Sequence, residues 1–199
     1  MTTATPPRLA EGLLRLLLPP HDRDAVSGDL LEEYRDSIHA SRGPARADAW
    51  YWIQVLGFLW HDNKLPAALL GSLLIARTAL DWLVPTTDFH TRSTLTTWLV
   101  IGTQLFAGFA AAWRSRSPWI GPFAGAMTVF IAQLLHIAGA LCLLALFHDQ
   151  RTWAAIEASG GLDEVFALPM LFVLPAALLA TVGSMFGYAV RSTATATER

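Results

Sequence analysis

The chain has 199 residues, of which 53% are hydrophobic and only 15% carry a charge, whereas an average soluble domain has about 25% charged residues. The apolar residues cluster in windows close to the roughly 20 residues that a helix needs to cross a bilayer, which indicates an integral membrane protein. The formal net charge of -2 gives no bias towards nucleic acid. The one lysine, Lys64, lies in HDNKLP, which excludes a P-loop ATPase.

Residues 1–62 are predicted to form a small cytoplasmic module of three helices. Residues 7–18 have the pattern of a short amphipathic helix, and the charges of Glu11 and Arg15 within it exclude a signal peptide. Residues 21–40 form a second helical pattern, which SRGP ends. Residues 49–60 are uncharged and rich in tryptophan but too short to cross, so we predict a separate helix at the membrane–water boundary.

The second helix of this module is acidic on its polar positions. Because it lies outside the predicted bilayer, a solvated surface would have the same composition. We nevertheless predict that it presents a partner-binding face, which we call the acidic face, made of Asp29, Glu32, Glu33 and Asp36.

Residues 63–191 are predicted to hold four membrane spans, at about 65–84, 95–113, 121–146 and 168–190, followed by a disordered tail at 192–199. The predicted fold is therefore all-α, a four-helix transmembrane bundle preceded by a small cytoplasmic helical module. Most basic residues precede the first span, lie between the second and third spans, or follow the fourth. The positive-inside rule then predicts that both termini are cytoplasmic.

Polar side chains inside these spans are candidates for function, because ionisable groups are costly in hydrocarbon. They could line a polar cavity. Alternatively, the ionised pair could neutralise itself, and the neutral side chains could join helices by hydrogen bonds of about 0.6–2 kcal/mol each. Both interpretations stay open for this cluster, which comprises Arg77, Asp81, Gln104, Gln133 and His136.

Small residues at helical spacing predict close packing of the third and fourth spans, since they let helix backbones approach. The pattern leaves open whether the partner helix belongs to this chain or to another protein. The residues concerned are Gly121, Gly125, Ala176, Ala180, Gly183 and Gly187.

The predicted outer loops contain Asp88, His90, His148 and Asp149 close to span ends. Two imidazoles and two carboxylates could bind a divalent metal. However, their spacing matches no known metal-ligand helix, and ordinary polar residues at loop ends would give the same pattern. We therefore predict no metal site and no cofactor. No nucleophile–base motif is present either, so we predict that the protein is not an enzyme.

Three blocks of the N-terminal module resemble a known family. They are Pro6-Pro7-Arg8-Leu9-Ala10 with Leu18-Pro19-Pro20, Gly28-Asp29-Leu30 with Glu32-Glu33-Tyr34-Arg35, and Trp50-Tyr51-Trp52 with Gln54-Val55-Leu56. Over about residues 6–60 the chain resembles the permease prefix domain, the N-terminal module of FtsX and macrolide-exporter type ABC permeases. The resemblance implies a cytoplasmic helical module with a role in regulation or assembly, in a bacterial inner membrane.

The remainder of the chain departs from those permeases. The predicted outer loops are short, so the large extracytoplasmic domain of such a permease is missing, and its transport mechanism is not implied. We expect a non-enzymatic accessory, regulatory or assembly partner related to ABC-type permeases, in contact with the lipid bilayer and with a membrane-protein partner or a second copy of itself. The alternative is a small transporter or channel that acts as an oligomer through the polar intramembrane residues.

Overall fold

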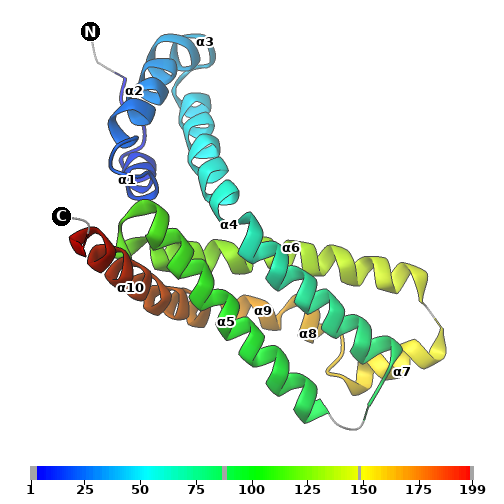
Figure 1. Cartoon of the computed structure of the whole chain (residues 1–199). Coiled ribbons are helices and arrows are strands. Elements are labelled where there is room, and N and C mark those ends of the chain that lie inside the picture. Colours follow the sequence, from blue (N-terminus) through cyan, green and yellow to red (C-terminus); the bar gives the residue numbers. More distant parts are fainter. Residues whose placement is uncertain (1–3, 87–88, 148, 198–199) are drawn as a thin grey trace.

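The computed structural model describes residues 4–86, 89–147 and 149–197, and these form helices and their connections without any strand. Four helices are long and apolar enough to cross a membrane, which confirms the all-α prediction. They are α4 (Pro44–Leu83), α5 (Phe89–Ser115), α6 (Gly121–Leu146) and α10 (Val173–Thr197). Figure 1 shows the N-terminal module at one end of this bundle and the short helices that precede α10 towards the other.

The module is built from α1 (Arg8–Leu17), α2 (Arg23–Glu33), the π-helical turn η1 (Tyr34–His39), α3 (Ala40–Arg42) and the first half of α4. Gly43 has a φ of 78°, which an L side chain rarely adopts, and Pro44 opens α4 directly after it. The predicted break in SRGP therefore reverses the chain, so that α1 and η1 pack against the start of α4.

The buried side of the amphipathic helix α1 does not include all of its leucines. Ala10, Leu14 and Leu17 are buried, whereas Leu9 is 80% exposed. Glu11 points into the module instead and accepts hydrogen bonds there. The shared core of the module consists of these α1 residues with Tyr34, Ile38, Ala47, Tyr51, Val55 and Leu59.

The largest correction concerns α4, which runs without a break from Pro44 to Leu83. A separate helix at 49–60 is therefore wrong, because these residues and the predicted first span at 65–84 belong to one helix. Pro66 lacks an N–H, so it leaves the carbonyl of Asp62 without its helical donor. The Nη2 of Arg114 on α5 donates to that carbonyl at 2.7 Å. In Figure 1, α4 changes direction between the module and the bundle but stays helical.

The polar residues after Trp60 support this continuity. Asn63 is buried, and its Nδ2 donates to the Leu59 carbonyl at 2.8 Å, while Thr128 Oγ1 on α6 donates to its Oδ1 at 3.5 Å. The side-chain amide of Asn63 thus forms hydrogen bonds within α4 and with α6, at the place where the predicted helices were separate.

The predicted small residues lie where helices of this same chain pack closely. A Cβ at Gly125 would lie 2.6 Å from the Ala176 carbonyl oxygen, and one at Gly187 would lie 2.6 Å from the Phe109 carbonyl oxygen. Ala180 is fully buried against α5 and α6, where Gly108 and Gly121 face its backbone. Gly183 lies against Leu105, and Gly108 is a contact that the sequence analysis missed.

The fourth span also differs from its prediction of 168–190. It is divided into α9 (Leu168–Leu171) and α10, which begins at Val173 and continues to Thr197. Residues 192–197 of the predicted tail are helical in α10, and residues 198–199 lie outside the described residues. Two contacts support this extension of the helix. Ser192 Oγ donates to the Tyr188 carbonyl at 2.9 Å, and the guanidinium carbon of Arg191 lies 5.6 Å from the centre of the Trp113 ring.

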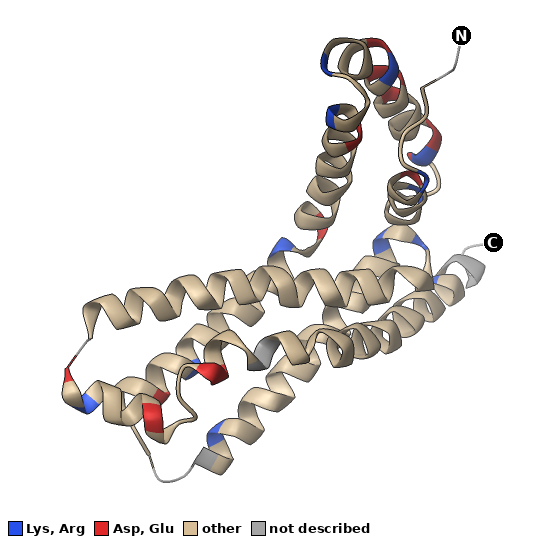
Figure 2. Cartoon of the chain, turned by 180° about the vertical axis from the view of Figure 1, so that it is seen from behind, with Lys and Arg blue, Asp and Glu red and all other residues tan. Residues whose placement is uncertain are grey.

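Figure 2 shows that charged residues gather in the module, at its junction with the bundle and at the opposite end, with an uncharged stretch between. Large apolar side chains in that stretch point outward, including Trp98 at 67% and Phe186 at 66% exposed. A surface this apolar requires a hydrocarbon environment rather than water. The four long apolar helices therefore indicate a membrane protein.

Substituting Gly108 with alanine should destabilise the bundle, because the new Cβ would overlap the backbone of Ala180. Overpacking of this kind costs about 1–3 kcal/mol. Gly102 lies on the same helix, and a Cβ added there would meet nothing within 4 Å, so Gly102→Ala is the matched control. Thermal unfolding followed by tryptophan fluorescence should show a lower Tm for Gly108→Ala only; equal Tm values would contradict the packing.

Candidate functional site

The acidic face is accessible in the structure. Asp29, Glu32, Glu33 and Asp36 are all exposed, on α2 and η1. None of the four forms an ion pair with a basic side chain in the part of the chain that the structure describes. Their charges are therefore available to a positively charged surface of another molecule.

Hydrogen bonds between helices hold the module in shape beneath this face. Glu11 accepts from Arg15 Nε at 2.7 Å and from Ser27 Oγ at 2.6 Å, and the Tyr51 hydroxyl donates to its other oxygen. Burial alone would raise the pKa of Glu11, but these donors outweigh it and hold that pKa below its usual range. Glu11 therefore links α1, α2 and α4 as a carboxylate.

Tyr34 makes a second link inside the module. Its hydroxyl donates to Asp48 Oδ1 at 2.7 Å, and its ring meets the Tyr51 ring edge-on at 5.8 Å between centroids. Burial, reinforced by the bond to Asp48, raises the pKa of Tyr34 to about 12. Tyr34 and Tyr51 belong to the second and third blocks on which the family resemblance rests, so those blocks meet in the core of the module.

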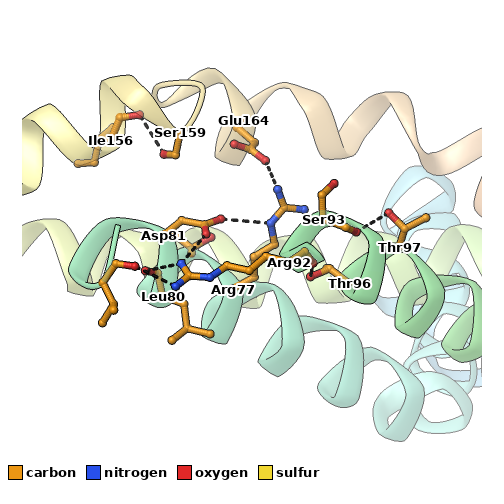
Figure 3. A network of polar contacts seen from close by, with 12 residues as sticks. Arg77, Leu80, Asp81, Arg92, Ser93, Thr96, Thr97, Ile156, Ser159 and Glu164 are labelled. Carbon is orange, nitrogen blue, oxygen red and sulfur yellow. Dashed lines mark hydrogen bonds and ion pairs between the residues drawn. The ribbon is translucent and has the colours of Figure 1, made fainter. Parts of the chain in front are cut away.

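At the other end of the bundle, charged side chains form one connected network (Figure 3). Arg77 Nε lies 3.3 Å from Asp81 Oδ2, and Arg77 Nη2 donates to Glu164 Oε1 at 2.8 Å. Arg92 Nη1 donates to Asp81 Oδ1 at 3.1 Å and to the Leu80 carbonyl at 3.0 Å. Two guanidinium groups thus pair with two carboxylates, from α4, α5 and α8 (Asp163–Phe166).

Glu164 and Arg92 were not among the predicted site residues. Glu164 lay in a predicted outer loop, but α8 brings it against α4 (Figure 3). Burial raises the pKa of Glu164, while Arg77 opposes that rise. A signal was present, because arginine four residues before aspartate is the weaker helical order and favours a further partner for Arg77.

The neutral members of the predicted cluster lie deeper and are fully or almost fully buried. His136 Nε2 is 2.8 Å from Thr78 Oγ1, and Gln133 Nε2 donates to the Val165 carbonyl at 2.6 Å. Gln104 is different, since neither its Nε2 nor its Oε1 has a partner among the described residues. Gln133 Oε1 and His136 Nδ1 are likewise without a partner there.

All five predicted polar residues line one cavity of about 360 Å³, together with Glu164. We call it the outer cavity because it occupies the half of the bundle remote from the module. Its other walls are mostly apolar and come from α4, α5, α6, α8, α10 and Phe172 just before α10. They include Leu70, Leu74, Val100, Val129, Val165 and Leu179. The glycine contacts described above fill the bundle on the module side of the cavity.

The outer-loop residues that were considered as metal ligands are only partly described in the structure. Asp88 and His148 lie outside the described residues. Asp149 caps α7 (Gln150–Ala158) by accepting from the backbone N–H groups of Arg151 and Thr152, each at 3.0 Å. Among the described residues no three histidine, cysteine or acidic side chains are grouped as metal ligands.

Comparison of the chain with family models, with curated proteins and with solved structures gave no match. The resemblance of residues 6–60 to the permease prefix domain therefore stays a prediction, and the site is interpreted from its own geometry.

Replacing Arg77 with methionine should lower the free energy of unfolding, because Glu164 and Asp81 lose a donor in a partly buried site. A cost of about 1–3 kcal/mol is typical. Arg151 is exposed at the same end of the bundle, so Arg151→Met is the control. The further loss caused by Glu164→Gln should be smaller in the Arg77→Met background; strict additivity in chemical denaturation would contradict the pairing.

Proposed function

We propose that the protein is a non-enzymatic accessory, regulatory or assembly partner of another membrane protein, related to ABC-type permeases and located in a bacterial inner membrane. The observation that carries the proposal is an exposed acidic face on a module that is continuous, through α4, with the membrane bundle. A partner bound at the face would therefore be held at a fixed place relative to the bilayer.

The chemistry of the face favours a basic partner surface. Four carboxylates lie within about two helical turns and have no intramolecular cation to neutralise them in the described structure. Such charges mainly govern which partner binds and how fast. The bonds of Glu11 and Tyr34 fix α2 and η1 beneath the face, so little ordering is required when a partner binds.

The proposed topology has both termini in the cytoplasm. It is supported by the excess of arginine in the module and in the connection between α5 and α6, compared with the other end of the bundle. Arg92 lies at that other end but is paired with Asp81, so its charge is partly neutralised.

The transport alternative is less well supported by the geometry. The outer cavity would be the obvious path, since it contains the predicted residues. However, Gly108, Gly183 and Gly187 bring α5 and α10 together on its inner side, and Asn63 and Thr128 join α4 to α6. Because the helices are packed together on the module side of the cavity, the cavity resembles a binding pocket more than an open pathway across the membrane.

The acidic face can be tested by neutralising it with Asp29→Asn, Glu32→Gln, Glu33→Gln and Asp36→Asn together. After cross-linking in native membranes, quantitative mass spectrometry should recover a partner with the wild-type chain and lose it with the variant. The control is Glu157→Gln with Asp163→Asn, exposed carboxylates at the opposite end. Equal recovery with all three chains would contradict the proposal.

The topology can be tested with single cysteines in a Cys142→Ala background, because Cys142 is the one native cysteine. Ala45 lies in the module and Gln150 at the outer end, and both are exposed. A membrane-impermeant maleimide should label Gln150→Cys in intact spheroplasts but Ala45→Cys only after lysis. The reverse pattern would overturn the proposed orientation.

A further inference from the structure

The outer cavity contains buried polar atoms that the protein itself leaves without partners. Gln104 is 0% exposed, yet its amide donates to nothing and accepts from nothing among the described residues. An unsatisfied buried polar group costs about 1–3 kcal/mol, and such groups are rare enough to need an explanation. Because Gln104, Gln133 and His136 line the same cavity, one bound molecule could satisfy all three.

The charges around the cavity indicate an uncharged head group. Arg77 and Arg92 are already paired with Asp81 and Glu164, so the network has a formal charge of zero. A charged ligand would have to break these pairs, and it would carry its charge into the membrane interior at high cost. The atoms left free are neutral: amide N–H groups, two amide oxygens and an imidazole nitrogen.

Those atoms include both donors and acceptors. The Gln104 amide offers both, whereas Gln133 Oε1 only accepts. A hydroxyl group can donate and accept at once, so a head with hydroxyl groups matches the mixture. Acceptor-only heads such as ketones would leave Gln133 Oε1 unsatisfied.

The entrance of the cavity faces the lipid. Among the lining residues, Thr97 on α5 and Phe172 and Pro175 near the start of α10 are exposed. On the module side of these residues, α5 and α10 are in contact at Gly183. Figures 1 and 2 show that the two helices move apart with increasing distance from the module. The gap is rimmed by apolar side chains such as Ile101 and Leu179, which suits a hydrocarbon tail.

We propose that the outer cavity binds an uncharged, hydroxyl-bearing membrane lipid. Its head group contacts Gln104, Gln133 and His136, and its tail leaves between α5 and α10 into the bilayer. A volume of about 360 Å³ lies in the range of small-molecule sites, roughly 300–1,000 Å³, and accommodates a head and the first part of a tail. This site is independent of the acidic face and of any partner bound there.

The test uses a diacylglycerol with a photoreactive diazirine in one chain, added to the full chain in phosphatidylcholine nanodiscs. Irradiation followed by peptide mapping should place the label on α5 and α10 beside the cavity. Gln104→Met keeps the shape but removes the amide, and labelling should fall about fivefold, the loss expected for one hydrogen bond. Ile101→Trp blocks the entrance without touching a polar group and should also reduce labelling.

A stability measurement separates ligand binding from a structural role for Gln104. Without diacylglycerol, Gln104→Met should unfold at the same temperature as the wild type or higher, because it removes an unsatisfied amide. A lower Tm would mean that the amide is structural and would overturn the proposal. Equal labelling of the wild type and both variants would overturn it too, as would equal or stronger labelling by the anionic phosphatidic acid carrying the same chains.

Discussion

The hydrogen bond from Arg114 to the Asp62 carbonyl supports α4 where the module meets the bundle, beside an apolar core that continues from the module into Ala111, Ala112, Ile120 and Ala124. Pro66 removes the helical donor to that carbonyl, at the place where α4 passes from the module into the bundle. Arg114 replaces the donor from α5 at 2.7 Å. With this bond α4 is one helix, and the module becomes an extension of the bundle. Without it, Pro66 would permit a hinge at the membrane boundary.

Because α4 is continuous, one helix connects the module to the far end of the bundle, and the two ends differ in structure. At one end, Glu11 and Tyr34 tie the module together beneath its exposed carboxylates. At the other, α8 places Glu164 beside Arg77 and forms part of the wall of the outer cavity. Between them, glycine contacts pack α5 and α10 tightly. We propose that a protein partner binds at the module end and a lipid at the far end.

Much of this fold could be predicted because the bilayer imposes simple rules on sequence. Long apolar stretches indicated the helices that could cross, and small residues such as Gly125 and Gly187 indicated close packing. The predicted polar residues line one cavity because each lies on the inner side of its helix. The sequence could not show that Glu164 joins them, since that depends on how a short helix folds back. Gly108 stands four residues before Ala112, the same small-residue spacing, so its close contact with Ala180 could have been predicted as well.

Two of the errors share a cause, which is that contacts from other helices overruled a local pattern. The third, at the end of α10, involves hydrogen bonds within one helix. HDNK at residues 61–64 resembles an interruption, but Asn63 and Asp62 find partners on neighbouring helices. Leu9 resembles a core residue, but it is exposed, and Glu11 points into the module instead. The end of α10 resembles a polar tail, yet its hydroxyl groups bond back to the helix.

Hydrogen exchange of the backbone amides between residues 58 and 70, measured in nanodiscs, tests the continuity of α4 most directly. A single helix held by Arg114 predicts slow exchange across this stretch in the wild type. It also predicts faster exchange there in Arg114→Ala, with the rest of the bundle unchanged. Fast exchange in the wild type, or no change in the variant, would mean that the module is not held to the bundle in this way.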